Sequence, residues 1–227
     1  MITLHYYPSN ASFAPHVLLR ELGVPFQLQL VDRNQGAHKT PEFLKLNPNG
    51  LIPVLVDGEL VLYETAAVLL HLADAHPAAG LAPPLGSAAR AQYYKWMVWL
   101  SNTMQAAMTP YYYPERWLAA GNTEAAAQVK AAAQARLGDC LQQIDAQLAA
   151  QGPVDGPSGG PSDGPWLLGE RYSAVDPLAF MLCRWTRHFA HQPARDYAHI
   201  GPYLQRMLAR PAVQAAVQAE GLQPPLV

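Results

Sequence analysis

The chain has 227 residues with 15 basic and 17 acidic side chains, so its formal net charge is −2. Half of the residues are hydrophobic and 14% are charged, which excludes an intrinsically disordered chain and predicts a globular protein with a sizeable core. The charge balance excludes the strongly basic surface of a nucleic-acid-binding protein. No apolar run reaches the length of a membrane-spanning helix, about 20 residues, so no membrane partner is expected.

The first third of the sequence alternates between strand and helix patterns. The elements that we expect there, in chain order, are a strand at 2–7, a helix at 14–22, a strand at 26–31, a short helical turn at 40–46, a β-hairpin at 54–62 and a helix at 65–74. A strand-helix-strand unit followed by a hairpin and a helix predicts one mixed sheet with helices packed on it. The opening residues contain no basic segment, so we do not expect a signal peptide there.

The rest of the sequence has an almost entirely helical pattern. We expect a first domain over residues 1–77, a linker rich in Pro and Gly over 78–86, and an all-α domain over 87–227. One helix begins at Ser87, and its apolar side chains recur every three or four residues. A last helix is expected over residues 203–220.

The middle of this helical half contains a long helix, a loop and a helix cap. The long helix is expected over residues 123–151, and the Gly- and Pro-rich run 152–165 predicts a surface loop. Ser173 and Asp176 have the spacing of a capping box, with Asp in place of Glu, and predict the start of a buried helix.

The two cysteines, Cys140 and Cys183, lie far apart in helical patterns, so we expect free buried thiols rather than a disulfide. Free thiols suit a cytoplasmic protein. The sequence has no CxxC or HExxH motif and no Cys/His cluster, so no metal site is expected.

The stretch NPNGLIPVLVDGELVLYET, residues 47–65, combines a β-hairpin with two unusual features. The DG pair between two apolar strands is a typical hairpin turn. Pro53 stands at the start of the first strand, where it cannot donate a ladder hydrogen bond. Glu64 and Thr65 follow the second strand and place an acidic side chain and a hydroxyl at the start of the next helix.

Three segments together resemble the cytosolic glutathione S-transferase family along nearly the whole chain: EFLKLNPNGLIPVLVDG, the Glu64-Thr65 pair, and LLGERYSAVD in the helical half. The resemblance implies an α/β thioredoxin-like N-terminal domain and an all-α helical-bundle C-terminal domain, which is the glutathione S-transferase fold. It also implies glutathione as the co-substrate, a small hydrophobic electrophile as the second substrate, no metal, and a C2 homodimer.

The resemblance further implies a glutathione site made by several segments. Pro53 would follow a cis peptide bond, so that the backbone of Ile52 pairs with the cysteinyl part of glutathione like an added strand. Glu64 and Thr65 would meet the γ-glutamyl end, while Thr65 can serve as an N-cap at the same time. The remaining candidates for glutathione contacts are His38, Lys39 and Asn49. His38 or Lys39 would meet the glycine carboxylate, the alternative for both being a solvated loop position.

The chemistry needs a thiolate. A free thiol has a pKa of about 8.5, so the site must stabilise the ionised form at neutral pH. Donors at the start of the first helix, with its dipole, are the expected means. Ser12 is the first candidate because it falls at that helix start, with an N-cap role as the alternative, and Asn10 and Ser9 follow it. Tyr6 and Tyr7 point to opposite faces of a strand, so at most one of them can serve.

The run YYPSNASFAPHVLLREL is most similar to the bacterial beta-type branch of the family. That branch has a cysteine in this turn, where this chain has Ala11, and a histidine in the first long helix of the second domain, where this chain has Gln105. Without the cysteine no mixed disulfide with glutathione can form at the turn. Activation of the thiol by hydrogen bonds is therefore the expected mechanism.

The second substrate is expected against an aromatic, polarisable wall from the second domain. The candidates for that wall are Gln105, Met108, Tyr111, Tyr112 and Trp117, with Tyr113, Trp185, His188 and Phe189 as further candidates. Core packing is the alternative for several of them. The helix after Ser87 is apolar on more than one face, so we expect a dimer interface there, with Ser101 or Asn102 approaching the partner's glutathione.

The predicted reaction is attack of the bound thiolate on a small hydrophobic electrophile. The sequence is also compatible with two other functions. One is another glutathione-dependent reaction, such as peroxide reduction, dehalogenation or isomerisation, although the chain lacks the SSCxW turn of the isomerase branch. The other is a protein that binds glutathione, hydrophobic ligands or a protein partner without turnover. The fold alone does not name the electrophile.

Overall fold

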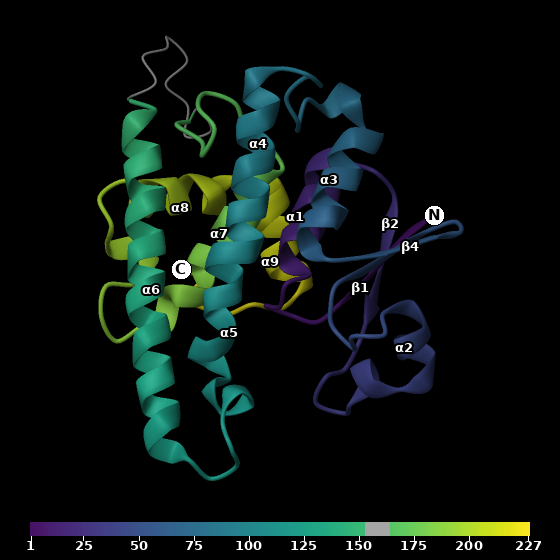
Figure 1. The fold of residues 1–227 in the computed structure, drawn as a ribbon. Coiled ribbons are helices and arrows are strands. Elements are labelled where there is room, and N and C mark those ends of the chain that lie inside the picture. Colours follow the sequence, from purple (N-terminus) through teal and green to yellow (C-terminus); the bar gives the residue numbers. More distant parts are fainter. Residues whose placement is uncertain (153–163) are drawn as a thin grey trace.

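The computed structural model describes residues 1–152 and 164–227, so most of the expected Gly- and Pro-rich loop lies outside the described residues. One side of the molecule is a small mixed sheet together with the helices that pack on it. The other side is a group of longer helices (Figure 1). None of the described helices combines the length and the apolar character that crossing a membrane requires.

Four strands form one sheet in the order β2-β1-β3-β4. The strands are β1 (Ile2–Tyr6), β2 (Phe26–Leu30), β3 (Val54–Asp57) and β4 (Leu60–Tyr63). Strand β2 is parallel to β1, whereas β3 is antiparallel to both β1 and β4. The parallel pair needs a crossover, which α1 supplies, and the antiparallel pair needs only the tight turn between β3 and β4. The order of elements agrees with the mixed sheet expected from the sequence.

Helices cover both faces of this sheet. Helices α1 (Phe13–Leu22) and α3 (Thr65–Ala75) lie between the sheet and the helical half of the molecule, and α2 (Pro41–Leu46) lies on the other side (Figure 1). Every residue from Phe13 to Leu19 is buried, because α1 packs against the sheet, α3, α7 and α9 at once. Gly23 ends α1 in the left-handed conformation with φ 64°.

The helical half is built around one buried helix. Its helices are α4 (Ala88–Trp99), α5 (Ala106–Tyr112), α6 (Thr123–Ala150), α7 (Val175–Trp185), α8 (Ile200–Ala209) and α9 (Pro211–Ala219). Helix α7 is buried from Val175 to Arg184. A π-helical segment, Leu100–Gln105, joins α4 to α5, and such segments are frequent at functional sites.

Only half of the expected capping box forms at the start of α7: Asp176 accepts from Ser173, but the N-cap position is Ala174 and no side chain caps the helix there. The backbone N–H of Ser173 donates to the carboxylate of Asp176 at 2.8 Å, and the Ser173 hydroxyl donates to the same carboxylate at 3.2 Å. The backbone N–H of Leu167 and the hydroxyl of Tyr203 also donate to it. Burial raises the pKa of Asp176 to about 6, although these hydrogen bonds favour the ionised form. Both cysteines are free and buried, as expected.

The prediction of a single helix over residues 203–220 is wrong, because this segment forms two helices, α8 and α9. Arg210 between them is extended, with φ −68° and ψ 131°. Proline disfavours the helical conformation in the residue before it and has no N–H for the helix ladder, so Pro211 ends one helix and begins the next. The break lets α9 turn back and pack against α1.

Candidate functional site

Two adjoining cavities lie between the N-terminal loops and the helical half. The main cavity, of about 800 Å³, is lined by residues 7–11 and 49–52 on one side and by α5 and the segments after α5 and α7 on the other. The side cavity, of about 300 Å³, is lined by Glu64, Thr65 and part of the π-helical segment. Gln105 and Thr109 line both cavities, so the two cavities meet at these side chains.

The turn before α1 presents two of the three expected catalytic side chains to the main cavity. Ser9 and Asn10 line it, and Asn10 Oδ1 accepts a hydrogen bond from the N–H of Ala11 at 2.8 Å. Ser12 does not line either cavity. Its side chain is fully buried, and its hydroxyl donates to the carbonyl of Tyr7 and accepts from the Tyr7 N–H, both at 3.2 Å. The geometry therefore gives Ser12 a structural place in the turn.

Three side chains from the helical half hold Ser9, which has an unusual positive φ of 61°. The carboxylate of Glu220, just after α9, accepts from the Ser9 N–H at 2.8 Å. Arg184 Nη1 donates to the Ser9 hydroxyl at 3.0 Å, and the indole N–H of Trp185 donates to the Ser9 carbonyl at 3.2 Å. Burial lowers the pKa of Arg184 to about 10, so this guanidinium stays charged at neutral pH.

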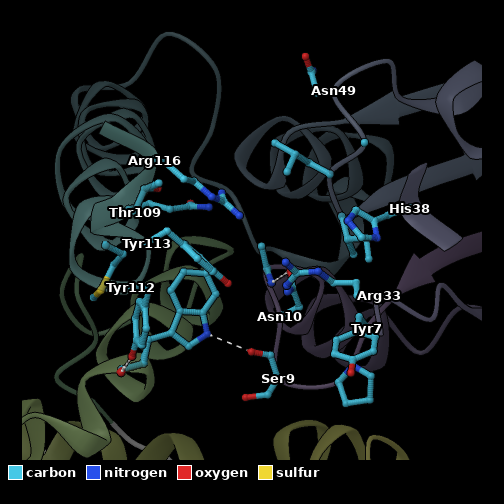
Figure 2. Close-up of a pocket in the computed structure, with 18 of the residues that line it drawn as sticks. Tyr7, Ser9, Asn10, Arg33, His38, Asn49, Thr109, Tyr112, Tyr113 and Arg116 are labelled. Atoms are coloured by element: carbon cyan, nitrogen blue, oxygen red, sulfur yellow. Dashed lines mark hydrogen bonds between the residues drawn. The ribbon is translucent and has the colours of Figure 1, made fainter. Parts of the chain in front are cut away.

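The segment before β3 forms the next part of the main cavity. The Ile52–Pro53 peptide bond is cis, and Ile52 lines the cavity. The ladder pairs of β3 begin at Val54, so the sheet does not use the backbone groups of Ile52. Gly50 has φ 62°, and a Cβ there would lie 2.9 Å from the backbone oxygen of His38. Only glycine therefore fits the close approach of this loop to His38. Asn49 lies at the rim (Figure 2).

The basic side chains expected for a carboxylate lie on the same wall. His38 and Lys39 both line the main cavity, and Arg33, which no sequence pattern indicated, lines it as well and lies near His38 (Figure 2). Among the described residues, His38 Nδ1 is buried and has no hydrogen-bond partner. Desolvation lowers the pKa of His38, and the charges of Arg33 and Lys39 lower it further. His38 is thus a predominantly neutral donor at neutral pH that can become charged beside an anion.

The expected γ-glutamyl residues line the side cavity. Thr65 is the first residue of α3, is buried, and its hydroxyl donates to the carbonyl of Ala11 at 3.4 Å. Glu64 precedes it with a positive φ of 73° and makes no capping hydrogen bond. Ser101 lines the same cavity in the same chain, whereas Asn102 is exposed. The N-terminus of α3 thus opens into a polar cavity, an arrangement that favours an anion.

The helical wall contains some of the residues expected to meet the second substrate. Gln105, Met108 and Tyr112 line the main cavity, together with Tyr113 and Trp185. Tyr111 lies outside it because its ring packs on Phe189, with centroids 4.4 Å apart, and Trp117 and His188 are exposed outside it. The Tyr112 hydroxyl donates to the carbonyl of Trp185. Burial raises the pKa of Tyr112 to about 12, so it stays a neutral phenol.

The sequence did not indicate three arginines that line the cavity, Arg33, Arg116 and Arg187. It also did not indicate the hydrogen bonds that the helical half makes to Ser9. Arg116 follows the aromatic run 111–113 and could have been selected with it, but nothing local marks the other positions. Tyr7 rather than Tyr6 lines the main cavity, in agreement with their opposite faces on the strand. Within residues 1–152 and 164–227, no group of three or more His, Cys, Asp or Glu is placed to hold a metal ion.

Comparisons with known proteins agree with this architecture. Residues 1–74 match the family described as "Glutathione S-transferase, N-terminal domain", and residues 100–211 match "Glutathione S-transferase, C-terminal domain". A glutathione S-transferase of Xanthomonas campestris pv. campestris, GST-4.5, is 30% identical over 96% of this chain and 98% of its own length.

Solved structures give the same result. A glutathione transferase homologue from Sulfitobacter, determined with bound glutathione, has a TM-score of 0.82 and 28% identity over 98% of this chain and 99% of its own. A beta-class glutathione S-transferase from Sphingomonas chungbukensis has a TM-score of 0.77 and 29% identity over 97% of this chain and all of its own. The chain, with its thioredoxin-like N-terminal part and its helical C-terminal part, therefore belongs to the glutathione S-transferase family.

Proposed function

We propose that this protein is a glutathione transferase that binds glutathione along the two adjoining cavities. The sharing of Gln105 and Thr109 by both cavities is the observation that carries the proposal, because an extended tripeptide that passes these side chains reaches both cavities. Its γ-glutamyl end lies at the start of α3, where Thr65 meets the carboxylate and Glu64 the ammonium. Its cysteinyl backbone pairs with Ile52 as an added strand.

The glycine end of glutathione lies against the basic wall of the main cavity. His38 and Lys39 supply a donor and a charge for the glycine carboxylate, and Arg33 stands beside them. Charge-assisted hydrogen bonds to a carboxylate are stronger than neutral ones. Asn49 at the rim is a further candidate contact to this end, and Pro53 is buried next to Ile52.

Asn10 is the side chain that we assign to thiolate stabilisation. Its Oδ1 accepts from the Ala11 N–H, so its side-chain amide donors remain for the thiol. Ser9 contributes to the same turn, and Ser12 supports it from behind through Tyr7. The nearby helix start adds the positive end of a dipole.

The second substrate occupies the remaining part of the main cavity, beside Gln105, Met108 and Tyr112. The thiolate attacks an electrophilic carbon there, a C–S bond forms, and the leaving group departs with its electron pair. Holding both reactants together and keeping the thiol ionised are the two sources of acceleration. Ala11 at the turn removes the thiol that a mixed disulfide would need, so a transfer reaction fits these residues better than disulfide exchange.

A calorimetric titration tests this proposal. Reduced glutathione is titrated near pH 6.5, about two units below the pKa of a free thiol, in two buffers with different ionisation enthalpies. The difference between the buffers counts the protons released on binding. Binding with release of a substantial fraction of a proton supports a transferase that ionises the thiol. Binding without release favours a carrier, and no binding contradicts the proposed site.

A homodimer is part of the proposal and rests on α4. Val98 is 61% exposed and Tyr94 41% exposed on this helix, where they leave apolar surface uncovered in the single chain. Large apolar side chains on one helix face are typical of an interface in a symmetric dimer.

A further inference from the structure

The main cavity is strongly basic although the chain as a whole carries a net charge of −2. The basic side chains that line it are Arg33, His38, Lys39, Arg116 and Arg187. Among the described residues that line this cavity there is no Asp or Glu. A concave site lined by one sign of charge concentrates ligands of the opposite sign.

The basic side chains lie on two opposite walls. Arg33, His38 and Lys39 belong to the N-terminal wall, where the glycine carboxylate of glutathione has its place in the proposed function. Arg116 follows α5 in the segment Pro114–Trp117, and Arg187 follows α7 in the segment Thr186–His188. Figure 2 shows Arg116 with Thr109 and Tyr113 on one wall, and Arg33 and His38 across the cavity. The helical wall therefore carries two guanidinium groups of its own.

Both arginines share the cavity lining with tyrosine rings, and one of them lies over such a ring. The guanidinium carbon of Arg116 lies 4.0 Å from the ring centroid of Tyr113. Arg187 lines the same cavity as Tyr112, and its charge lowers the pKa of that phenol against the effect of burial. Arg187 Nη1 also donates to the carbonyl of Arg184 at 3.1 Å, which fixes the direction of its guanidinium. This wall therefore presents both flat tyrosine rings and guanidinium charges to a ligand in the cavity.

The anionic groups of glutathione do not account for this wall. In the proposed binding mode its two carboxylates lie at α3 and at the N-terminal basic wall, and its thiolate lies at the turn before α1. Arg116 and Arg187 then face the place of the second substrate. Arginine presents several donors in a planar fork that matches a carboxylate, and it stacks on aromatic rings. A wall made of tyrosines and arginines suits an aromatic anion better than a purely hydrophobic molecule.

We propose that the second substrate is a flat aromatic electrophile bearing a carboxylate, whose ring packs on Tyr112 and Tyr113 and whose carboxylate pairs with Arg116 and Arg187. This inference rests on the proposed function for the place of glutathione. It narrows the expected small hydrophobic electrophile to an anionic one.

The test measures binding of meta-nitrobenzoate and of its uncharged methyl ester, two compounds that do not react with thiols. Both are titrated calorimetrically into the protein, with and without saturating S-methylglutathione, which lacks a free thiol. The acid is expected to bind about tenfold more tightly than the ester, as a charge-assisted hydrogen bond allows. Equal binding, or tighter binding of the ester, would overturn the inference.

Four variants locate the groups that cause the preference for the acid. Arg116→Gln and Arg187→Gln are each expected to reduce the ratio of acid to ester affinity by about threefold, and Arg116→Lys to retain part of it. Lys39→Gln, on the opposite wall, is expected to leave the ratio unchanged. A ratio that falls in Lys39→Gln and not in the arginine variants would place the carboxylate at the glycine end and overturn the inference.

The test of the anionic substrate can fail independently of the test of the transferase function. Failure of reduced glutathione to bind would contradict the transferase, whereas the acid-to-ester ratio is still measured on the protein alone. Normal glutathione binding with a ratio of one would leave the transferase standing and remove only the anionic substrate.

Discussion

The hydroxyl of Ser12 and the side-chain amide of Asn10 lie two residues apart but have different surroundings. Asn10 lines the main cavity, whereas the Ser12 hydroxyl is bonded to both backbone groups of Tyr7. We expect Asn10→Ala to raise the pKa of the bound glutathione thiol by about one unit, because one donor to the thiolate is lost. Ser12→Ala should leave this thiol pKa unchanged and lower the free energy of unfolding by about 1–3 kcal/mol.

Ultraviolet titration of the thiolate in the complex measures the first quantity, and denaturant unfolding measures the second. The two variants serve as controls for each other. If Ser12→Ala raises the thiol pKa as much as Asn10→Ala does, the Ser12 hydroxyl contributes to thiolate stabilisation and the assignment to Asn10 alone is wrong.

The titration of His38 predicts how the affinity for a glutathione analogue depends on pH. Its pKa in the free protein is lowered from 6.5 by desolvation, Arg33 and Lys39. A carboxylate placed against it raises that pKa, so binding takes up protons. Affinity for S-methylglutathione should therefore rise as pH falls through the raised pKa of the complex, and level off below the lowered pKa of the free protein. The thioether has no ionisable thiol, so this titration isolates the imidazole.

The variant His38→Asn keeps a donor but cannot titrate. Its affinity for S-methylglutathione should be nearly independent of pH between about 5 and 7.5, since the carboxylates and the amine of this ligand titrate outside that range. A pH dependence equal to that of the unchanged protein would assign the proton uptake to another group.

The candidate site divides into residues that local patterns reveal and residues that only the fold brings together. Ile52, Glu64 and Thr65 lie in one continuous motif, and the structure places all of them at the cavities. The burial of Ser12 could not be read from its position, because Ser12 and Asn10 share the same turn. Arg187 and Glu220 reach the site over more than 170 residues of chain, and no local pattern records such a contact.

At the level of elements, the turn before α1 depends on the helical half of the molecule. The buried carboxylate of Glu220 accepts from the Ser9 N–H and pairs with His16 Nδ1 at 2.9 Å. We expect Glu220→Gln to lower the free energy of unfolding by about 2 kcal/mol or more. The amide has only one oxygen acceptor, so its NH2 group would face either the Ser9 N–H or His16 Nδ1 and leave that group without its acceptor. The thiol pKa of bound glutathione should rise as well, since Ser9 loses its anchor.

Glu59→Gln, in the exposed hairpin turn, is the matched control and should change stability by less than about 0.5 kcal/mol. The thiol pKa is read well below the unfolding temperature of each variant. A loss of stability with an unchanged thiol pKa would limit Glu220 to a structural role.

Element boundaries follow the local signals where such signals exist. Ser87 starts α4 by accepting from the N–H of Arg90 at 3.1 Å, and Gly23 stops α1. The split between α8 and α9 was also marked in the sequence, by Pro211, but the apolar spacing continues across it and favours one helix. The π-helical segment before α5 has no such mark, because a wider helical turn arises from packing rather than from a residue type.

At the scale of the whole molecule, the two structural halves share one site and one core. Helix α1 packs on α7 and α9, and Arg210 pairs with Glu21 of α1 through two hydrogen bonds of 2.6 and 2.9 Å. The main cavity takes its charges from both halves. A ligand that bridges the cavity therefore stabilises the contact between the halves as well as each half.

The last prediction concerns the proposed dimer. Val98 is the most exposed large apolar side chain of α4, so a charge there would be buried without a partner if α4 forms the interface. We expect Val98→Glu to convert a dimer into a monomer of unchanged helix content, measured by light scattering after size exclusion and by circular dichroism. Leu30→Glu, at an exposed position of 49% on the edge strand β2, is the control and should remain dimeric. A Val98→Glu protein that stays dimeric would place the interface on a different surface, and a monomeric unchanged protein would remove the dimer from the proposed function.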